Sequence, residues 1–394
     1  MLLGLVGKPS CGKSTFFKAC TLANVAIAPY PFTTIKPNHG IGYVKIECID
    51  KDLGVQCNPR EGFCIDHFRF VPVELMDVAG LVPGASQGKG LGNQFLDDLR
   101  QADAFIHIVD SSGTTNEEGK QTQNYNPVND IAFLEKELDL WYLGVLKKVW
   151  KTFTRTVEIQ HQKFEEAVAK QFSGLRVNKD HVLKVIGKTK YNTEKPTAWT
   201  EEQLENFAHE LRIISKPTII AANKCDMPNS KENIEKIKQA YPEFIVIPCS
   251  ADFELALREA SKEKKIKYIP GDNKFEIMGE LTEKQKQALE YIKERVLNVY
   301  GSTGVQQVLN TAVFELLKYI AVFPAGVKKL ADSQGRILPD CFLIPENSTA
   351  IDFAFMIHTD LGNNFVKAID VKTKLAIGKD HKLKHRDGIE IITR

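Results

Sequence analysis

A glycine-rich loop directly follows the first apolar strand of this chain. Met1 to Val6 form a short apolar run, and residues 7–15 read Gly-Lys-Pro-Ser-Cys-Gly-Lys-Ser-Thr. The pattern G-x-x-x-x-G-K-[ST] lets the backbone turn around a phosphate chain, with N–H groups and the next helix's positive end facing it. A plain glycine turn between strand and helix is the alternative, but strand, loop and helical pattern follow in the required order. We therefore expect a phosphate-binding loop.

Two side chains of this loop have predicted chemical roles. Lys13 is expected to reach the β- and γ-phosphates, and the Ser14 hydroxyl to bind Mg²⁺. The loop residues predicted to bind nucleotide are Gly7, Pro9, Ser10, Cys11, Gly12, Lys13, Ser14 and Thr15.

Length and composition indicate a folded protein of two or three domains, with 394 residues of which 43% are hydrophobic. No apolar run reaches the roughly 18 to 20 residues of a membrane span, and the N-terminus lacks a signal-peptide profile. Eight scattered cysteines suit reduced thiols. We expect a cytoplasmic protein without membrane contact.

A second nucleotide element follows the strand-like run 70–76. Asp77, Val78, Ala79 and Gly80 form the pattern D-x-x-G. The aspartate is expected to hold Mg²⁺, commonly through water, and the Gly80 N–H to sense the γ-phosphate. A glycine-rich stretch, 84–92, gives this switch flexible hinges.

A hydroxyl between these two elements is expected to close onto Mg²⁺ and the γ-phosphate. Residues 30–34 read Tyr-Pro-Phe-Thr-Thr, and we favour Thr34 slightly over Thr33; a β-turn before a strand is the alternative. The predicted catalytic set is Lys13, Thr34 and Gly80, and the predicted metal set is Ser14, Thr34 and Asp77.

The base is read by a third element, which follows the apolar run 217–222. Asn223, Lys224, Cys225 and Asp226 place a carboxylate where guanine offers its N1–H and N2 amino group. Adenine lacks both donors, so the carboxylate would be left unpaired. Asn223 is expected either to contact the base or to brace the phosphate loop, and the Lys224 stem to lie along the base.

A fourth element completes the predicted site. The strand 244–248 leads to Ser250 and Ala251, whose backbone N–H groups suit guanine O6. Four elements in order on strand ends, with a further parallel strand at 104–110, predict a doubly wound α/β sheet that binds its ligand at the carboxyl ends of the strands. The predicted ligands are GTP or GDP with Mg²⁺.

These motifs resemble the Obg group of translation-associated GTPases along nearly the whole chain. The resemblance rests on residues 30–34, 77–85 and 88–96, and the stretch 338–388 is similar to a TGS domain, a small β-grasp module. The YchF-related branch is the nearest likeness, because it interrupts its GTPase domain with a helical arm and ends in TGS. YchF proper resembles an ATPase that lacks the base-reading aspartate, whereas this chain has Asp226. The resemblance therefore implies an archaeal-type, GTP-preferring relative.

The resemblance and the spacing of the elements suggest four parts. We predict a P-loop GTPase domain at 1–113 and 214–280, an inserted helical arm at 114–213, connecting helices at 281–321 and a TGS domain at 322–394. About a hundred residues separate the strands 104–110 and 217–222, far more than a crossover needs. Their apolar spacing predicts a helical hairpin.

Hydrolysis is expected to be slow. Leu81 stands where Ras-like enzymes carry the glutamine that orients the attacking water. Attack would depend on backbone groups, a monovalent cation or a residue donated by a partner. Potassium is a candidate, although Ser10 stands where potassium-activated relatives often carry asparagine.

Two segments are basic within a nearly neutral chain. Residues 143–190 hold eleven Lys or Arg against four acidic residues, and 366–386 hold seven against two. They suit RNA contact, or are ordinary solvated helix faces. In the arm, Trp150, Lys151, Arg155 and His161 are candidates for RNA contact or for packing. The lysines at 367, 372, 374, 382 and 384 give the tail a basic face.

A group of cysteines lies between the first two nucleotide elements. Cys48, Cys57, Cys64 and His67 stand nine, seven and three residues apart. This spacing allows zinc but lacks a C-x₂-C knuckle, so a Cys57–Cys64 disulfide and ordinary loop thiols stay open.

The leading hypothesis is a GTPase switch acting in translation or ribosome assembly. It would bind the ribosome, ribosomal RNA or tRNA through the arm and TGS domain, as a monomer and without DNA. The first alternative is a YchF-like ATPase or stress-linked protein-binding regulator modulated by nucleotide. A structural RNA-binding protein with a vestigial site is the second, disfavoured because Lys13, Ser14 and Asp77 are intact.

Overall fold

The computed structural model describes residues 1–22, 39–78 and 99–394, which group into two compact units. The first unit comprises Met1–Lys18, Glu74–Phe253 and Thr303–Val305, and the second comprises Ala19–Val73, Glu254–Ser302 and Gln306–Arg394. Among the helices of the described ranges, none combines the length and apolar character that a membrane crossing requires.

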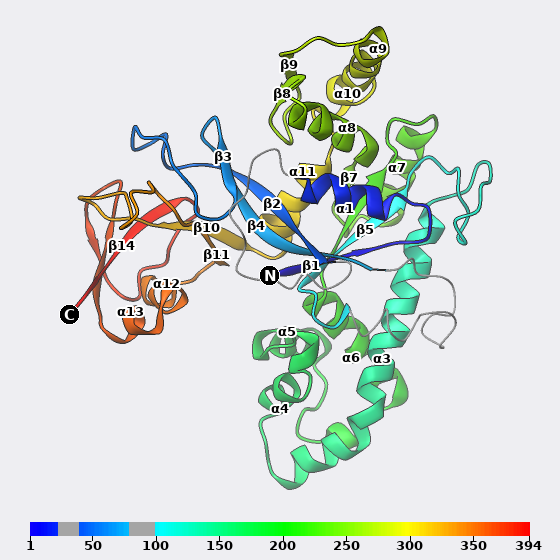
Figure 1. Cartoon of the computed structure of the whole chain (residues 1–394). Helices are drawn as coiled ribbons and strands as arrows, with labels where there is room; N and C mark the ends of the chain where they lie inside the picture. The colour runs from blue at the N-terminus through cyan, green and yellow to red at the C-terminus, as the bar shows by residue number, and fades with distance from the viewer. Residues whose placement is uncertain (23–38, 79–98) are drawn as a thin grey trace. The chain divides into compact units, whose positions relative to one another are not determined.

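The first unit is built on parallel strands (Figure 1). The parallel part of the sheet has the order β4, β1, β5, β6 and β7, and every neighbouring pair in it is parallel. The bounds are β1 Leu2–Val6, β4 Phe68–Asp77, β5 Ala104–Asp110, β6 Thr218–Asn223 and β7 Val246–Pro248. All residues of β1, β5 and β6 are buried, as expected for strands covered on both faces.

The strand order fixes where a ligand can bind. From β1 the chain goes to β4 on one side and then to β5 on the other, so the order reverses at β1. Such a reversal leaves a crevice at the carboxyl ends of the strands. Among the described residues, the helices that accompany the sheet are α1 (Lys13–Thr21), α7 (Ser230–Ala240) and α8 (Ala251–Lys262).

The insertion between β5 and β6 contains four helices rather than the predicted hairpin. They are α3 (Val128–Ile159), α4 (Phe164–Gln171), α5 (Lys179–Thr189) and α6 (Glu201–Ser215), with short 3₁₀ turns at Ser173–Leu175 and Pro196–Ala198. α6 packs on α3 and α5 (Figure 1). The apolar spacing found the first two helices, whereas α5 and α6 were missed.

Aromatic side chains form the centre of this arm. Phe207 is fully buried, and its ring lies 5.2 to 5.9 Å from those of Trp150, Phe164 and Trp199. Trp150 is 8% exposed, so it packs in the core, which is the alternative we left open for it.

Two strands of the second unit pair with β4. β2 (His39–Glu47) lies beside β4, and β3 (Phe63–Ile65) pairs with the first residues of β4. Tyr43, Phe63 and Phe70 form a small apolar core there. A separate two-stranded ribbon joins β8 (Ile266–Tyr268) to β9 (Phe275–Ile277).

Connecting helices lead to a second sheet. They are α9 (Glu283–Ile292), α10 (Asn298–Tyr300) and α11 (Val305–Thr311), with π-helical turns at Lys293–Leu297 and Ala312–Leu316. The sheet that follows has the order β11, β10, β14, β12 and β13, in which only β10 and β14 are parallel. Its strands are β10 Tyr319–Pro324, β11 Phe342–Pro345, β12 Phe365–Asp370, β13 Ala376–Ile377 and β14 Asp387–Thr393.

A helix packs on this mixed sheet, as in a β-grasp module. Phe353 of α12 (Ala350–Ile357) is fully buried against Val322, Ile344 and Ile389, and α13 (Thr359–Asn363) follows. The predicted fold class is thus confirmed for both the P-loop sheet and the C-terminal module. The domain limits stay a prediction; β10 begins at Tyr319, three residues before the predicted start of the last domain.

The aromatic centre of the arm gives a stability prediction. Phe207→Ala removes a fully buried ring, and we expect the arm's free energy of unfolding to fall by about 3–5 kcal/mol. The chain's three tryptophans all lie between residues 141 and 199, so tryptophan fluorescence during urea unfolding reports on the arm. Lys151→Ala, on the exposed side of α3, is the control and should shift the value by less than about 0.5 kcal/mol. Equal losses in both variants would contradict this packing.

Candidate functional site

The phosphate-binding loop uses backbone conformations that favour glycine. It joins β1 to α1, with φ of 149° at Gly7 and 97° at Gly12. A Cβ at Gly7 would lie 2.4 Å from the Ile108 carbonyl oxygen, and one at Gly12 would lie 2.2 Å from Asn223 Nδ2. Both glycines are therefore required by positive φ and by close approach.

Lys13 and Ser14 lie where the loop enters α1. Lys13 is 8% exposed, and its Nζ donates to the Lys8 carbonyl at 3.1 Å, inside the loop. Ser14 Oγ donates to Asp77 Oδ2 at 3.0 Å. A hydroxyl and a carboxylate this close suit Mg²⁺, which prefers oxygen ligands and keeps several waters. These side chains fit the predicted metal set.

Asn223 at the end of β6 bridges two parts of the site. Its Nδ2 donates to the Cys11 carbonyl at 2.9 Å, and its Oδ1 accepts from the Ala251 N–H at 3.0 Å. Asn223 was expected either to contact the base or to brace the phosphate loop, and its bond to the Cys11 carbonyl corresponds to the second role.

Lys224 continues this bracing from a left-handed backbone, with φ of 62°. Its Nζ donates to the Ser10 carbonyl at 3.1 Å and pairs with Asp110 Oδ2 at 2.7 Å. Although burial opposes ionisation of Asp110, hydrogen bonds from Lys224, Ser112 and Thr115 outweigh it and lower the pKa of this carboxyl. Sequence reasoning missed Asp110; its position at the end of β5 was the available signal.

Asp226 is held by a hydroxyl. Ser250 Oγ donates to Asp226 Oδ1 at 2.7 Å. The Ser250 N–H donates to the Thr303 carbonyl at 2.9 Å, and the Ala251 N–H is bound by Asn223. Both predicted O6 donors thus make internal hydrogen bonds, so a base would have to share or replace them.

A buried ion pair links the phosphate loop to the arm and was also missed by sequence reasoning. Lys8 Nζ lies 2.8 Å from Asp130 Oδ2 in the first turn of α3, and it donates to the Thr115 carbonyl at 2.6 Å. It also lies 4.3 Å from the centre of the Tyr125 ring. Burial raises the pKa of Asp130 to about 6, against the opposing effect of Lys8. The partners stand more than a hundred residues apart, so no local pattern indicated them.

The other predicted residues divide into two groups. Cys11 is fully buried, and burial raises the pKa of its thiol, which makes it an inert packing residue. Pro9 and Thr15 lie in the loop and in the first turn of α1. Thr33, Thr34, Gly80 and Leu81 lie outside the described residues, so their predicted roles stay predictions.

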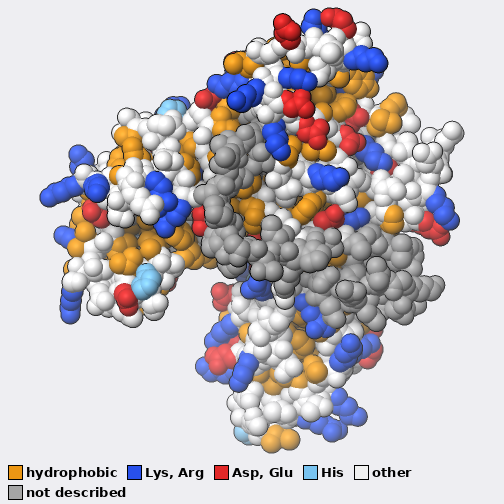
Figure 2. All heavy atoms as spheres, viewed as in Figure 1, with side chains coloured by type: hydrophobic (Ala, Val, Ile, Leu, Met, Phe, Trp, Pro, Cys, Tyr) orange, Lys and Arg blue, Asp and Glu red, His pale blue; other side chains and the backbone are white. Residues whose placement is uncertain are grey.

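The basic segments are partly engaged within the chain. Lys372 pairs with Asp52 at 2.7 Å, and Arg386 pairs with Asp52 at 3.1 Å and with Glu47 at 3.3 Å. Lys151, Arg155 and His161 are exposed. Figure 2 shows Lys and Arg interspersed with acidic side chains on the visible face.

The geometry defines a P-loop nucleotide-binding protein, and comparison with known families agrees. Residues 2–138 match the family "50S ribosome-binding GTPase", residues 221–326 match "Obg-like GTPase YGR210-like, G4 motif-containing domain", and residues 325–393 match "TGS domain".

Similar proteins extend along the full chain. The "Uncharacterized GTP-binding protein MJ1332" of Methanocaldococcus jannaschii is 49% identical over 100% of this chain and 99% of its own. A "Ribosome-binding ATPase YchF" of Buchnera aphidicola is 31% identical over 94% of this chain and 88% of its own. The crystal structure of a GTP-binding protein from Pyrococcus horikoshii OT3 has a TM-score of 0.81 and 40% identity, covering 100% of both chains. This chain belongs to the YchF-related branch of the Obg family of P-loop GTPases, with a C-terminal TGS domain.

The close approach at Gly12 gives a binding prediction. Gly12→Ala places a methyl group against Asn223 Nδ2 at a residue with φ of 97°, so the loop or its brace must move. Losing a buried hydrogen bond costs about 1–3 kcal/mol, and we expect GDP affinity to fall at least about tenfold in calorimetric titration. Gly144→Ala is the control, because no atom lies within 4 Å of the added Cβ. Unchanged affinity in Gly12→Ala would contradict the bracing role of Asn223.

Proposed function

We propose that this protein binds GTP with Mg²⁺ and hydrolyses it to GDP and phosphate as a switch that acts on the ribosome or its RNA. The arrangement around Asp226 carries the choice of GTP. The carboxylate follows the strand end that carries Asn223, and the Ser250 hydroxyl fixes one of its oxygens at 2.7 Å.

The chemistry of a carboxylate favours guanine at this position. An ionised carboxylate has about four lone-pair sites, so Asp226 can accept from Ser250 and still accept two hydrogen bonds. Guanine supplies these donors as N1–H and the N2 amino group, whereas adenine would leave the carboxylate unpaired. The relatives named as ATPases keep the alternative of ATP open, and a direct comparison of the two nucleotides distinguishes them.

Hydrolysis would rest on the phosphate side of the site. Lys13 would stabilise charge on the phosphates, Ser14 and Asp77 would hold Mg²⁺, and Thr34 and Gly80 would close the switch. Because position 81 is leucine, we infer slow intrinsic hydrolysis that a partner residue or K⁺ accelerates.

The ribosomal partner is inferred from the relatives and from the accessory regions. YchF relatives carry the name "Ribosome-binding ATPase", and the first family match is described as ribosome-binding. Lys151 and Arg155 of the arm and Lys367, Lys374 and Lys382 of the TGS domain are exposed cations that suit RNA phosphates. We propose that the protein acts as a monomer in the cytoplasm.

The assignment of guanine as the base is tested by replacing one carboxylate oxygen of Asp226 with an amide nitrogen. Asp226→Asn loses an acceptor for guanine, and its amide can donate to O2 of xanthine. A hydrogen bond to a charged group contributes about 1.5–3 kcal/mol, so we expect about 10- to 150-fold weaker GDP binding and a shift toward xanthosine nucleotides. Competition titrations with GTP, ATP and XTP measure this. Asp252→Asn, two positions beyond Ser250 and exposed, is the matched control. Tighter binding of ATP than GTP by the unmodified chain would favour the ATPase alternative.

The switch is tested by sedimentation with ribosomal subunits. We expect a non-hydrolysable GTP analogue and GDP to give affinities that differ by about 5- to 150-fold, the usual range of coupling between two sites. Lys13→Ala should bind subunits without this nucleotide difference. Equal binding with the analogue, with GDP and without nucleotide would instead favour an RNA-binding protein with a vestigial site.

A further inference from the structure

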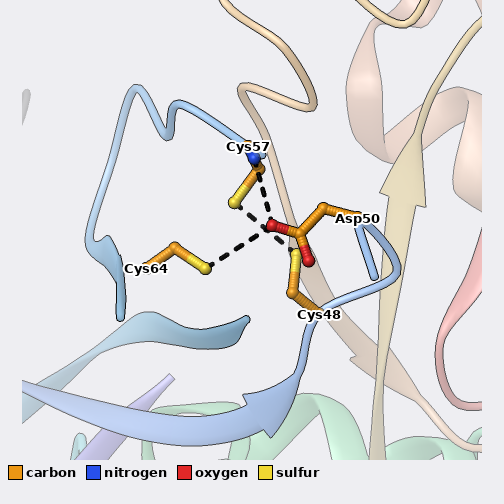
Figure 3. Close-up of side chains that lie close together, drawn as sticks. All are labelled: Cys48, Asp50, Cys57 and Cys64. Carbon is orange, nitrogen blue, oxygen red and sulfur yellow. Dashed lines mark hydrogen bonds between the residues drawn. The ribbon is translucent and has the colours of Figure 1, made fainter. Parts of the chain in front are cut away.

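Three thiols and a carboxylate converge in the second compact unit. The ligand atoms of Cys48, Asp50, Cys57 and Cys64 all lie within 4.8 Å of one another. Figure 3 shows the four side chains pointing toward a common centre. The proposed nucleotide site uses none of them.

The local fold brings these residues together. Cys48 directly follows β2, and Cys64 is the middle residue of β3. β3 and β4 are joined by Asp66 and His67, both at positive φ, as in a two-residue type I′ hairpin. The Cys48 N–H donates to the His67 carbonyl at 2.7 Å, which ties the end of β2 to this turn.

Asp50 is the member that sequence spacing missed. It is fully buried; its Oδ2 accepts from the Cys57 N–H at 3.0 Å and lies 3.8 Å from the Cys64 sulfur. Its Oδ1 lies 3.0 Å from His67 Nδ1. Within the described ranges no lysine or arginine pairs with this carboxylate, although burying a charge alone is costly. His67, whose spacing allowed it to be a ligand, instead contacts the carboxylate, as partners of metal ligands commonly do.

The sulfur spacing suits one metal ion better than a disulfide. Cys48 Sγ and Cys57 Sγ lie 3.6 Å apart, and none of the eight cysteines forms a disulfide. A disulfide needs about 2.05 Å. Tetrahedral zinc, with Zn–S of about 2.3 Å, places two sulfurs about 3.8 Å apart.

A buried cation stands beside the cluster. The Arg69 guanidinium is 1% exposed and donates to the Leu338 and Pro339 carbonyls at 2.9 and 2.8 Å. Its Nε has no hydrogen-bond partner, and no carboxylate of the described chain pairs with it. In the β3–β4 ladder, Arg69 stands opposite Cys64. Three thiolates and a carboxylate around a dication carry a net charge of −2, and this arginine would offset one unit of it.

We propose that Cys48, Asp50, Cys57 and Cys64 bind one zinc ion as a structural site. Three thiolates exclude Mg²⁺ and Ca²⁺, which require oxygen ligands, and four ligands of this type favour Zn²⁺. An iron–sulfur cluster would need its ligands spread around several metal atoms, farther apart than these.

The site would order a loop that contacts the TGS domain. In the loop 48–62, the Asn58 and Arg60 N–H groups donate to the Ile337 and Pro339 carbonyls at 2.8 and 2.9 Å. The Arg60 side chain pairs with Asp340, and Asp52 pairs with Lys372. Zinc therefore cross-links the end of β2, this loop and β3 where they meet the C-terminal segments.

Metal content of the full chain tests the proposal directly. We expect purified protein to hold about one zinc per chain by mass spectrometry of the metal. After chelation, Co²⁺ should restore one equivalent with sulfur-to-cobalt charge-transfer absorption and the d–d bands of tetrahedral cobalt. Protein that takes up neither metal would overturn the proposal.

Matched cysteine variants locate the site. Cys57→Ser should weaken zinc binding by at least 100-fold in a chelator competition, since a lost ligand costs more than the 10- to 100-fold of a lost outer-shell partner. Cys341→Ser, a partly exposed cysteine of the same unit outside the cluster, should retain full zinc. Equal zinc binding in both variants would exclude this ligand set.

Alkylation of the unmodified chain avoids dependence on variants that fail to fold. Peptide mass spectrometry should show Cys48, Cys57 and Cys64 protected from iodoacetamide with zinc and labelled together after chelation. Cys341 should label equally in both states. Labelling of the three cysteines that does not respond to zinc would also overturn the proposal.

Discussion

The two hydrogen bonds of Asn223 hold the nucleotide site together. One fixes the Cys11 carbonyl of the phosphate loop, and the other fixes the Ala251 N–H at the start of α8. The elements predicted to surround the phosphate and the base thus share one buried side chain, 3% exposed. Because the amide is satisfied on both sides, movement of either element would leave a buried polar group unpaired, which costs about 1–3 kcal/mol. Lys224, which forms an ion pair with Asp110, makes a second connection to the phosphate loop through the Ser10 carbonyl.

The same loop is tied to the arm by Lys8 and Asp130. A buried ion pair is costly to break, because one charge is then left without a partner. A shift of the loop would therefore break or strain this pair, whose acidic partner lies in the first turn of α3, the helix that runs through the arm. This gives a physical path from the phosphate loop to the region proposed to meet RNA, with Tyr125 and Thr115 packed around the ammonium.

The sequence predicted the parts of the candidate site that are encoded by short, contiguous motifs. The phosphate loop, Asp77 and the Asn223 to Asp226 element lie at strand ends as expected, because each motif includes the strand that positions it. Contacts between distant segments were not predictable: Lys8 with Asp130 requires the folded crossing between β5 and α3, and Asp50 joins the cysteines only through an irregular loop. The helices α5 and α6 were missed because their apolar residues complete a core that α3 begins. Thr34 and Gly80, outside the described residues, stay predictions.

The loop 48–62, which carries two of the clustered cysteines, has few buried apolar side chains to hold it in place. Between residues 48 and 62, a fully described stretch, the buried hydrophobic side chains are Cys48, Ile49 and Cys57. Burial of this small apolar area cannot offset the conformational entropy lost when the loop is ordered. Polar contacts or a metal must therefore supply the remaining stabilisation. Asp52 and Glu47 meanwhile neutralise Lys372 and Arg386, which removes two cations from the basic tail. A rigid loop at this position therefore determines both how the TGS domain is held and which of its lysines stay free to meet phosphate.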